Sequence, residues 1–249
     1  MKPFHFTLRP ADQSSLIAQF LLQMPKIAEI SPALAAAARR LHSRLVALPA
    51  SADLWFEACL ILERYAQHHP LAKPAPLRAE FIDKISPPTP LTFTAGVLLP
   101  YLEAALACDA RHLGAWAKYG EICELLCHYE YAAAAFTEAL RLHPRGHAIR
   151  IRLAHAQAAL GDLSAAIANY HIVLKKQPKN YWAWLNLGIA YAHARQFDAA
   201  EAAFQKAAAL QPKNPIPRQN LAALAKLRND PSPPPPEPDS DPDYPKTKP

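Results

Sequence analysis

From residue 181 to residue 214 the sequence reads YWAWLNLGIAYAHARQFDAAEAAFQKAAALQPKN, which predicts two helices joined by a short turn. Small Gly188 allows the second helix to approach the first, because a larger side chain would hold the two axes farther apart. Phe204 stands four residues after the small Ala200, so both lie on one face of the second helix. Pro212 then ends that helix, because its nitrogen has no hydrogen to donate.

The same arrangement occurs three times in a row, at an offset of 34 residues and without a gap. The three units are 113–146, 147–180 and 181–214. Small residues, a bulky ring and a final proline recur at matching positions, so we expect the three units to fold alike. The positions that define the repeats are Trp116, Gly120, Ala132, Phe136 and Pro144, then Leu153, Ala154, Ala166, Tyr170 and Pro178, then Trp184, Leu187, Gly188, Tyr191, Ala200, Phe204 and Pro212.

The seven positions of the third unit resemble the full signature of the tetratricopeptide repeat. The first unit departs from the signature at Cys123, where the pattern has tyrosine. The middle unit departs from it at Arg150, which replaces the tryptophan, and at Gln157, which replaces the tyrosine. The resemblance implies an all-α fold, an α-solenoid of stacked helix pairs. The composition agrees, because glycine is scarce and alanine runs favour helix.

The array is predicted to extend beyond its three repeats. Residues 215–228 are expected to form one more amphipathic helix, which resembles the capping helix that closes such arrays. Residues 97–108 are in register with the second helix of an earlier unit, and we interpret them as a degenerate half-repeat whose start Pro100 would break or kink. Together these segments predict a repeat domain at residues 90–228.

The two ends of the chain differ from the array. Residues 1–89 show helical spacing without the signature, and prolines near residues 86–90 indicate the boundary of this N-terminal helical region. The tail at residues 229–249 is rich in proline and acidic residues and nearly lacks apolar side chains, so we expect it to be disordered. An extended tail could also space the domain or be bound by a partner.

Charge and hydropathy favour a cytoplasmic protein without a membrane span. The first ten residues carry no apolar run of signal-peptide length, and no later stretch approaches an uninterrupted span. The four cysteines lie in helical, apolar contexts, which indicates free thiols in a reducing compartment. The formal net charge is +6, but the cations are scattered without a basic run, so nucleic acid is not an expected partner.

The candidate catalytic and metal-binding residues have simpler interpretations. Cys123, Cys127 and His128 have the chemistry of zinc ligands, with Cys108 as a conceivable fourth, yet they coincide with packing positions of the first repeat. No phosphate-binding loop, dinucleotide fingerprint or nucleophile elbow occurs in the sequence. We therefore expect no enzyme, no metal and no cofactor.

The resemblance also implies a concave groove, lined by the first helix of each repeat. Its mixture of apolar, cationic and imidazole side chains favours a short apolar or amphipathic partner segment. Alternatively, the N-terminal helices of the chain fill this groove themselves. The residues expected in the groove are Lys118, Glu121, Leu125, Ile151, Arg152, His155, Trp182, Leu185, Asn186, Ile189 and His193.

Three functions are compatible with this pattern. The first is an adaptor or assembly factor that binds a protein segment in the groove. In the second, residues 1–89 form a small enzymatic or ligand-binding module with the repeats as its targeting arm, supported by Trp55, Glu57, Cys59, Glu63 and His68 on one predicted helix. The third is a structural role in which the array mediates self-association.

Overall fold

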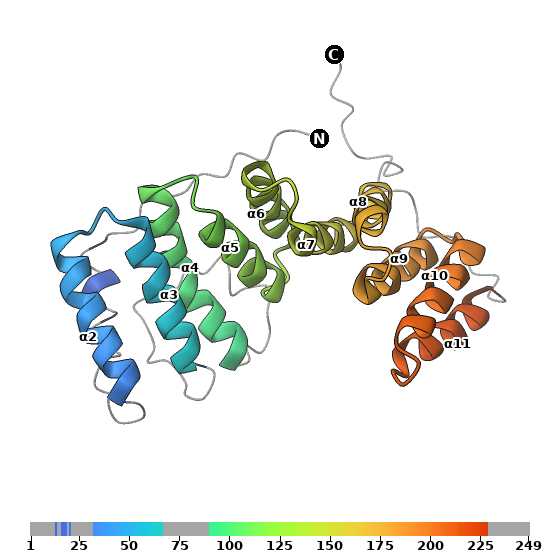
Figure 1. The fold of residues 1–249 in the computed structure, drawn as a ribbon, viewed down its shortest axis with the longest axis horizontal. Helices are drawn as coiled ribbons and strands as arrows, with labels where there is room; N and C mark the ends of the chain where they lie inside the picture. Colours follow the sequence, from blue (N-terminus) through green and yellow to red (C-terminus); the bar gives the residue numbers. More distant parts are fainter. Residues whose placement is uncertain (1–12, 14–15, 19, 21–31, 67–89, 229–249) are drawn as a thin grey trace, which may run out of the picture. The chain divides into compact units, whose positions relative to one another are not determined.

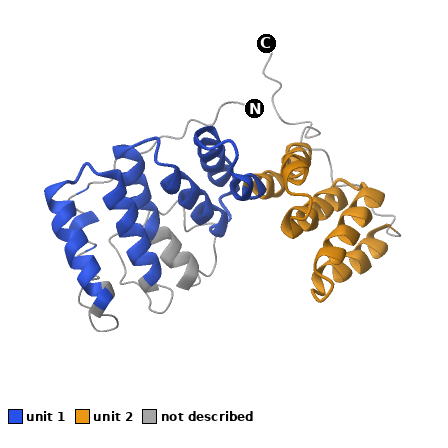
Figure 2. Cartoon of the chain, in the orientation of Figure 1, with its two compact units in different colours: residues 1–152 blue, residues 153–249 orange. Residues whose placement is uncertain are grey.

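The computed structural model describes residues 13, 16–18, 20, 32–66 and 90–228, and the regular structure of these residues is helical (Figure 1). The chain forms two compact units, residues 1–152 and 153–249 (Figure 2). The helices are α2 (Pro32–Ala47), α3 (Ala52–Ala66), α4 (Pro90–Cys108), α5 (Leu113–Leu125), α6 (Tyr129–Leu142), α7 (His147–Ala159), α8 (Leu163–Lys176), α9 (Tyr181–His193), α10 (Phe197–Leu210) and α11 (Ile216–Arg228).

In the first unit, successive helices pack side by side. Helix α2 contacts α3, α3 contacts α4, α4 contacts α5 and α5 contacts α6. The largest fully buried side chains between them are aromatic, among them Trp55, Tyr101, Tyr119 and Phe136. Burial of these rings supplies a large share of the apolar area that holds the helices together.

The second unit repeats this arrangement. Helix α9 packs against α8 and α10, while α11 packs against α10 and touches α9. Its core cluster joins Tyr181 and Leu185 of α9 to Phe204 of α10 and Leu224 of α11. Helix α11 therefore covers the end of the third helix pair, at the position predicted for a capping helix.

The close approach predicted at the small residues is present. A Cβ atom added to Gly120 would lie 2.5 Å from the ring of Phe136, and one added to Gly188 would lie 2.6 Å from the ring of Phe204. Real Cβ atoms do not come so near to other heavy atoms, so the aromatic ring fills the space that a side chain at the glycine would need. Each glycine is thus needed because the aromatic residue of the paired helix occupies the crossing point.

One hydrogen bond recurs at the start of each first helix. The indole Nε1–H of Trp116 donates to the carbonyl oxygen of Ala110 at 2.8 Å, and that of Trp184 donates to Pro178 at 2.8 Å. Arg150 donates from its guanidinium to Pro144 at 3.0 Å. Arginine can replace tryptophan in the middle repeat because it keeps the donor that reaches back to the preceding turn.

Helix α3 shares this hydrogen bond, although the sequence did not assign it to a repeat. Trp55 donates its Nε1–H to the carbonyl oxygen of Pro49 at 2.6 Å, across the same six-residue spacing. Helix α3 packs against α4, where Leu102 and Ala105 are fully buried. The predicted half-repeat at 97–108 is therefore one helix of an α3–α4 pair.

The start of α4 differs from its prediction. The helix begins at Pro90 and continues through Pro100, so the proline does not break it as one of the two predicted outcomes required. A proline inside a helix removes one backbone hydrogen bond, and the packing of the following turns against α3 offsets this loss. The segment 67–89, including the predicted domain boundary, and the tail at 229–249 lie outside the described residues, so those two assignments stay predictions.

The contact between Gly188 and Phe204 generates a first prediction. Gly188→Ala should lower the free energy of unfolding by about 1–3 kcal/mol, because the added methyl group must displace a ring that is buried on all sides. Chemical denaturation followed by circular dichroism measures the effect. In a Phe204→Leu background the same substitution should cost less, because the smaller side chain vacates part of the space. An equal loss in both backgrounds would contradict the proposed crossing.

Candidate partner-binding groove

The groove face of the second unit is formed by matching positions on α9 and α11. On α9 these positions are Trp182, Asn186, Ile189 and His193, which follow one another at helical spacing. The offset of 34 residues gives their equivalents on α11 as Ile216, Asn220, Ala223 and Leu227. The large apolar members of this face are exposed: Trp182 to 58%, Leu227 to 47%, Ile216 to 40% and Ile189 to 38%.

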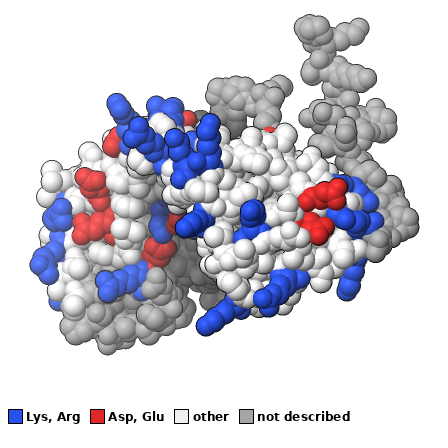
Figure 3. Space-filling model, turned by 45° about the vertical axis from the view of Figure 1, so that its right-hand side comes forward, with Lys and Arg blue, Asp and Glu red and all other residues white. Residues whose placement is uncertain are grey.

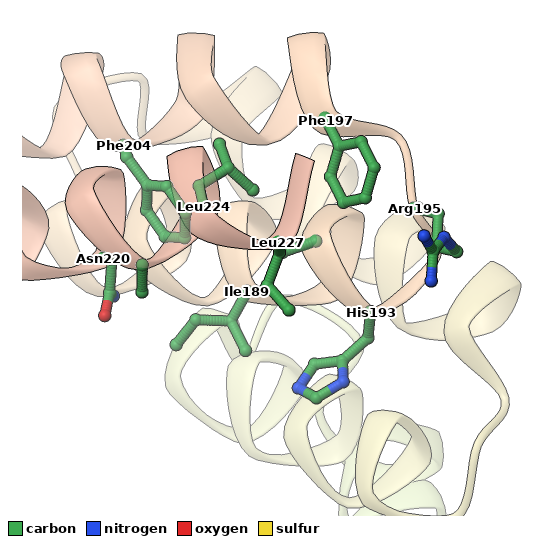
Figure 4. A pocket seen from close by; sticks show the side chains of 10 residues that line it. Ile189, His193, Arg195, Phe197, Phe204, Asn220, Leu224 and Leu227 are labelled. Atoms are coloured by element: carbon green, nitrogen blue, oxygen red, sulfur yellow. The ribbon is translucent and has the colours of Figure 1, made fainter. Parts of the chain in front are cut away.

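A pocket of about 330 Å³ lies at one end of this face, between α9, α10 and α11 (Figure 4). Its walls are apolar, with Ile189 from α9, Phe197 and Phe204 from α10, and Leu224 and Leu227 from α11. The rings and aliphatic side chains leave this space because small Ala223 stands on α11 where α9 has Ile189. The pocket is open to solvent and has room for an apolar side chain from another molecule.

Three polar side chains also line the pocket: His193, Arg195 and Asn220. The guanidinium carbon of Arg195 lies over the ring of Phe197, 5.5 Å from its centroid. This distance is typical of a cation–π contact. In Figure 4 the side chains of Arg195 and His193 lie on the same side of the pocket, where they supply its polar groups.

The burial of Leu185 contradicts its predicted place in the groove. It is exposed to only 3% and belongs to the core cluster with Phe204 and Leu224. Leu185 directly follows Trp184, and Phe56 directly follows Trp55 in the same way on α3. The ring of Phe56 lies next to Gly114 and so fills the space between α3 and α5, which is the first helix of the next pair. The side chain at this position packs between successive first helices, so Leu185 does not face a partner.

Two cations of the predicted groove, Lys118 and Arg152, form ion pairs with carboxylates of the first unit. Lys118 forms ion pairs with Glu63 at 3.1 Å and Glu121 at 3.0 Å. Arg152 pairs with Glu124 at 2.7 Å and with Glu121 at 3.6 Å. Figure 3 likewise shows acidic side chains beside basic ones at several places on the face it draws. Lys118 and Arg152 therefore offer little positive charge to a partner.

The pKa of Lys118 reflects this network. Partial burial lowers the pKa, but hydrogen bonds and charge attraction from Glu121 and Glu63 outweigh that effect and raise it above its ordinary value. Lys118 therefore stays charged at neutral pH. Its contribution to folding is present below the ordinary lysine pKa and is lost only as the pH rises through the higher folded value.

The other predicted groove residues differ in exposure and lie on different helices. Leu125 and His155 are exposed on α5 and α7, and Ile151 is half-buried on α7. Trp182 and Asn186 lie on the same face of α9 as Ile189 and His193, outside the pocket wall.

The sequence interpretation missed the α11 residues and Arg195. Applying the same offset to residues 215–228 would have identified Ile216, Asn220, Ala223 and Leu227. Arg195 gave no comparable signal, because its side chain enters the site from a turn.

The candidate chemical residues belong to the core and to ion pairs. Cys59 and Cys123 are buried, and burial raises the pKa of both thiols far above the ordinary value. Trp55 is buried beside Cys59, while Glu57 pairs with Arg44 at 3.3 Å. Within the part of the chain that the structure describes, no three His, Cys, Asp or Glu side chains converge as a metal site would require.

His68, the remaining member of the predicted N-terminal set, lies outside the described residues.

No helix among residues 32–66 and 90–228 is long and apolar enough to cross a membrane.

Comparison with known families matches a tetratricopeptide repeat model to residues 127–170 and 151–215. Residues 127–215 of the chain are therefore tetratricopeptide repeats. The matched segment includes the second helix of the first repeat and both later helix pairs, so the repeats recognised in the sequence are confirmed.

Curated relatives match this chain over a short length. It is 41% identical to Superkiller complex protein 3 of Mus musculus over 63 residues. This match covers 25% of the chain. The Homo sapiens protein of the same name is 39% identical over 68 residues, or 27% of this chain. The match spans only 4% of the length of each relative.

Solved structures share the fold over a longer stretch. The tetratricopeptide protein YrrB matches with a TM-score of 0.55 and 14% identity, covering 76% of this chain and 84% of YrrB. MamA matches with a TM-score of 0.55 and 16% identity, covering 80% of this chain and 94% of MamA. These likenesses confirm the predicted α-solenoid of tetratricopeptide helix pairs.

Burial divides the four thiols into two classes. At pH 8 a thiol reagent should label exposed Cys127 first and half-buried Cys108 more slowly, because burial raises the pKa of Cys108 and leaves less thiolate. Cys59 and Cys123 should react only after unfolding. Mass spectrometry of labelled peptides follows each site, and rapid labelling of all four thiols in the native protein would contradict their placement.

The corrected position of Leu185 gives a further prediction. Leu185→Asp should lower the free energy of unfolding by about 3 kcal/mol or more, because it places a carboxylate in the apolar core. Ile189→Asp, one turn later on the exposed face, should lower it by about 1 kcal/mol or less. Denaturation curves of the two variants compare them directly, and similar losses would show that both positions face the same environment.

Proposed function

We propose that this protein is an interaction module that binds a segment of a partner protein on the groove face of α9 and α11. The observation that carries the proposal is the row of exposed apolar side chains that ends in the pocket. An apolar surface of this kind is stabilised when another protein covers it. Within the cell the protein would act as an adaptor or assembly factor.

The polar residues of the same face suit a peptide main chain. Asn186 and Asn220 occupy matching positions on α9 and α11 and are half-buried. A carboxamide offers both a donor and an acceptor, which are the two groups that a peptide bond needs. Apolar side chains of the partner would then contact Trp182, Ile189 and Leu227, so an apolar or amphipathic segment fits best.

The known relatives support an interaction role without defining it. YrrB is described as a protein with an unusual peptide-binding site, and Superkiller complex protein 3 is named for a complex. An N-terminal enzymatic module has less support, because Trp55 and Cys59 are core residues and Glu57 and Glu63 form ion pairs. The cytoplasmic location expected from the sequence stays a prediction.

Affinity purification with a matched pair of variants tests the proposal. Ile189→Asp places a charge on the groove face, whereas Ile172→Asp places the same charge on α8 at a residue of similar exposure. Ile189→Asp should lose specific partners at least tenfold in quantitative mass spectrometry, while Ile172→Asp should retain them, because only the first faces the groove. Circular dichroism verifies that both variants fold. Identical partner profiles for both variants and the wild type would refute binding on this face.

A further inference from the structure

We propose that the pocket receives one apolar side chain of the partner segment and that Arg195 binds a carboxylate within two residues of that side chain. This inference rests on the proposed function and specifies the chemistry of the segment: an acidic residue next to a leucine, isoleucine or aromatic anchor. Three observations about the pocket and its rim carry it.

The first observation is the shape of the pocket. Its volume of about 330 Å³ lies at the small end of the range for ligand pockets, which suits one side chain rather than a large cofactor. Phe204 and Leu224 form its buried base, and Ile189 and Leu227 form its exposed walls. Interfaces concentrate binding energy in such pockets, where one anchor is fully desolvated.

The second observation is the backbone of Arg195. The turn between the two helices of each repeat contains one residue with positive φ, namely Cys127 at 59°, Gly161 at 84° and Arg195 at 56°. Glycine adopts this conformation without steric cost, whereas a residue with a Cβ is destabilised by about 1 kcal/mol. The third repeat has an arginine where the middle repeat has glycine. Because strained residues cluster at functional sites, the position of Arg195 beside the pocket supports a role for its side chain.

The third observation is the charge at the rim. The guanidinium of Arg195 is held against the ring of Phe197, and none of the described carboxylates lies within ion-pair distance of it. Nearby Asp198 and Glu201 instead pair with Arg228, at 2.7 and 3.3 Å. The ring orients the cation without neutralising it. An arginine in this state is ready to form the two parallel hydrogen bonds that a carboxylate accepts.

The N-terminus of α10 adds to this preference for an anion. Helix α10 begins at Phe197, and the side chain of its N-cap residue, Gln196, makes no capping hydrogen bond. In contrast, Asp162 and Asn180 cap α8 and α9 with their side chains. The free amide hydrogens at a helix start carry partial positive charge and favour a nearby carboxylate. Arg195 and this helix start flank the pocket from the same turn.

Selection from a phage-displayed library of random dodecapeptides on the full chain tests the proposal. Selected peptides should share an apolar anchor with Asp or Glu within two positions. A synthetic copy of the best peptide should bind Arg195→Glu at least tenfold more weakly than the wild type, because the variant repels its carboxylate. Lys206→Glu is the matched control: it makes the same charge change on α10 outside the pocket wall, and its affinity should stay within about twofold. A peptide with lysine in place of the acid should prefer Arg195→Glu.

A second pair of variants separates charge from folding. Arg195→Gly and Cys127→Gly both relieve a positive φ, so each should raise the midpoint of thermal unfolding by roughly 2–4 °C. Arg195→Gly should nevertheless lose the peptide, while Cys127→Gly should bind it as the wild type does. Greater stability with unchanged peptide binding in Arg195→Gly would overturn the role of its side chain.

The outcomes distinguish this inference from the proposed function. If Ile189→Asp abolishes peptide binding while Arg195→Glu behaves like Lys206→Glu, the groove stands and the carboxylate site is wrong. If Ile189→Asp binds as the wild type does, the proposed groove itself fails. A dimer by light scattering that Ile189→Asp dissociates would place a second copy in the pocket. Peptide binding that appears only after deletion of residues 229–249 would place the chain's own tail there. Either result overturns the proposal.

Discussion

The crossing of two helices at a glycine and a ring is the constraint on which the rest of the array depends. Phe136 and Phe204 occupy the volume that a Cβ atom would need at Gly120 and Gly188. With the axes held this close, the remaining positions of both helices are assigned to fixed neighbours. Which side chains face the paired helix, the next repeat or the solvent follows from this one contact.

The indole hydrogen bond adds a second constraint at the entrance of each first helix. The indoles of Trp116 and Trp184 and the guanidinium of Arg150 donate to the turn that precedes each helix, so the start of each first helix is held to that turn. Repeat proteins depend on such contacts between neighbours, because each unit is stabilised by the next. The same bond at Trp55 shows that α3 obeys the geometry of a first helix.

Sequence periodicity predicted the parts of the fold that depend on local spacing. The helix pairs and the small-residue crossings could be deduced because the residues that make them recur every 34 positions. The α3–α4 pair could not, because residues 67–89 separate its helices and hide the register. Leu185 was misplaced for a different reason. A helical wheel places it at the edge of the exposed stripe, and only the packing of α11 against the core cluster shows that it is covered.

Within each first helix, the residue type can vary only at positions whose side chains do not pack against a neighbouring helix. Lys118 and Arg152 use this freedom to form ion pairs with Glu63, Glu121 and Glu124. The corresponding positions on α9 and α11, Asn186 and Asn220, carry amides instead. The fold tolerates either choice, because these side chains contribute little to the core. Differences there must therefore be explained by what the surface contacts, and in the second unit the exposed apolar residues around the amides make a partner the simplest explanation.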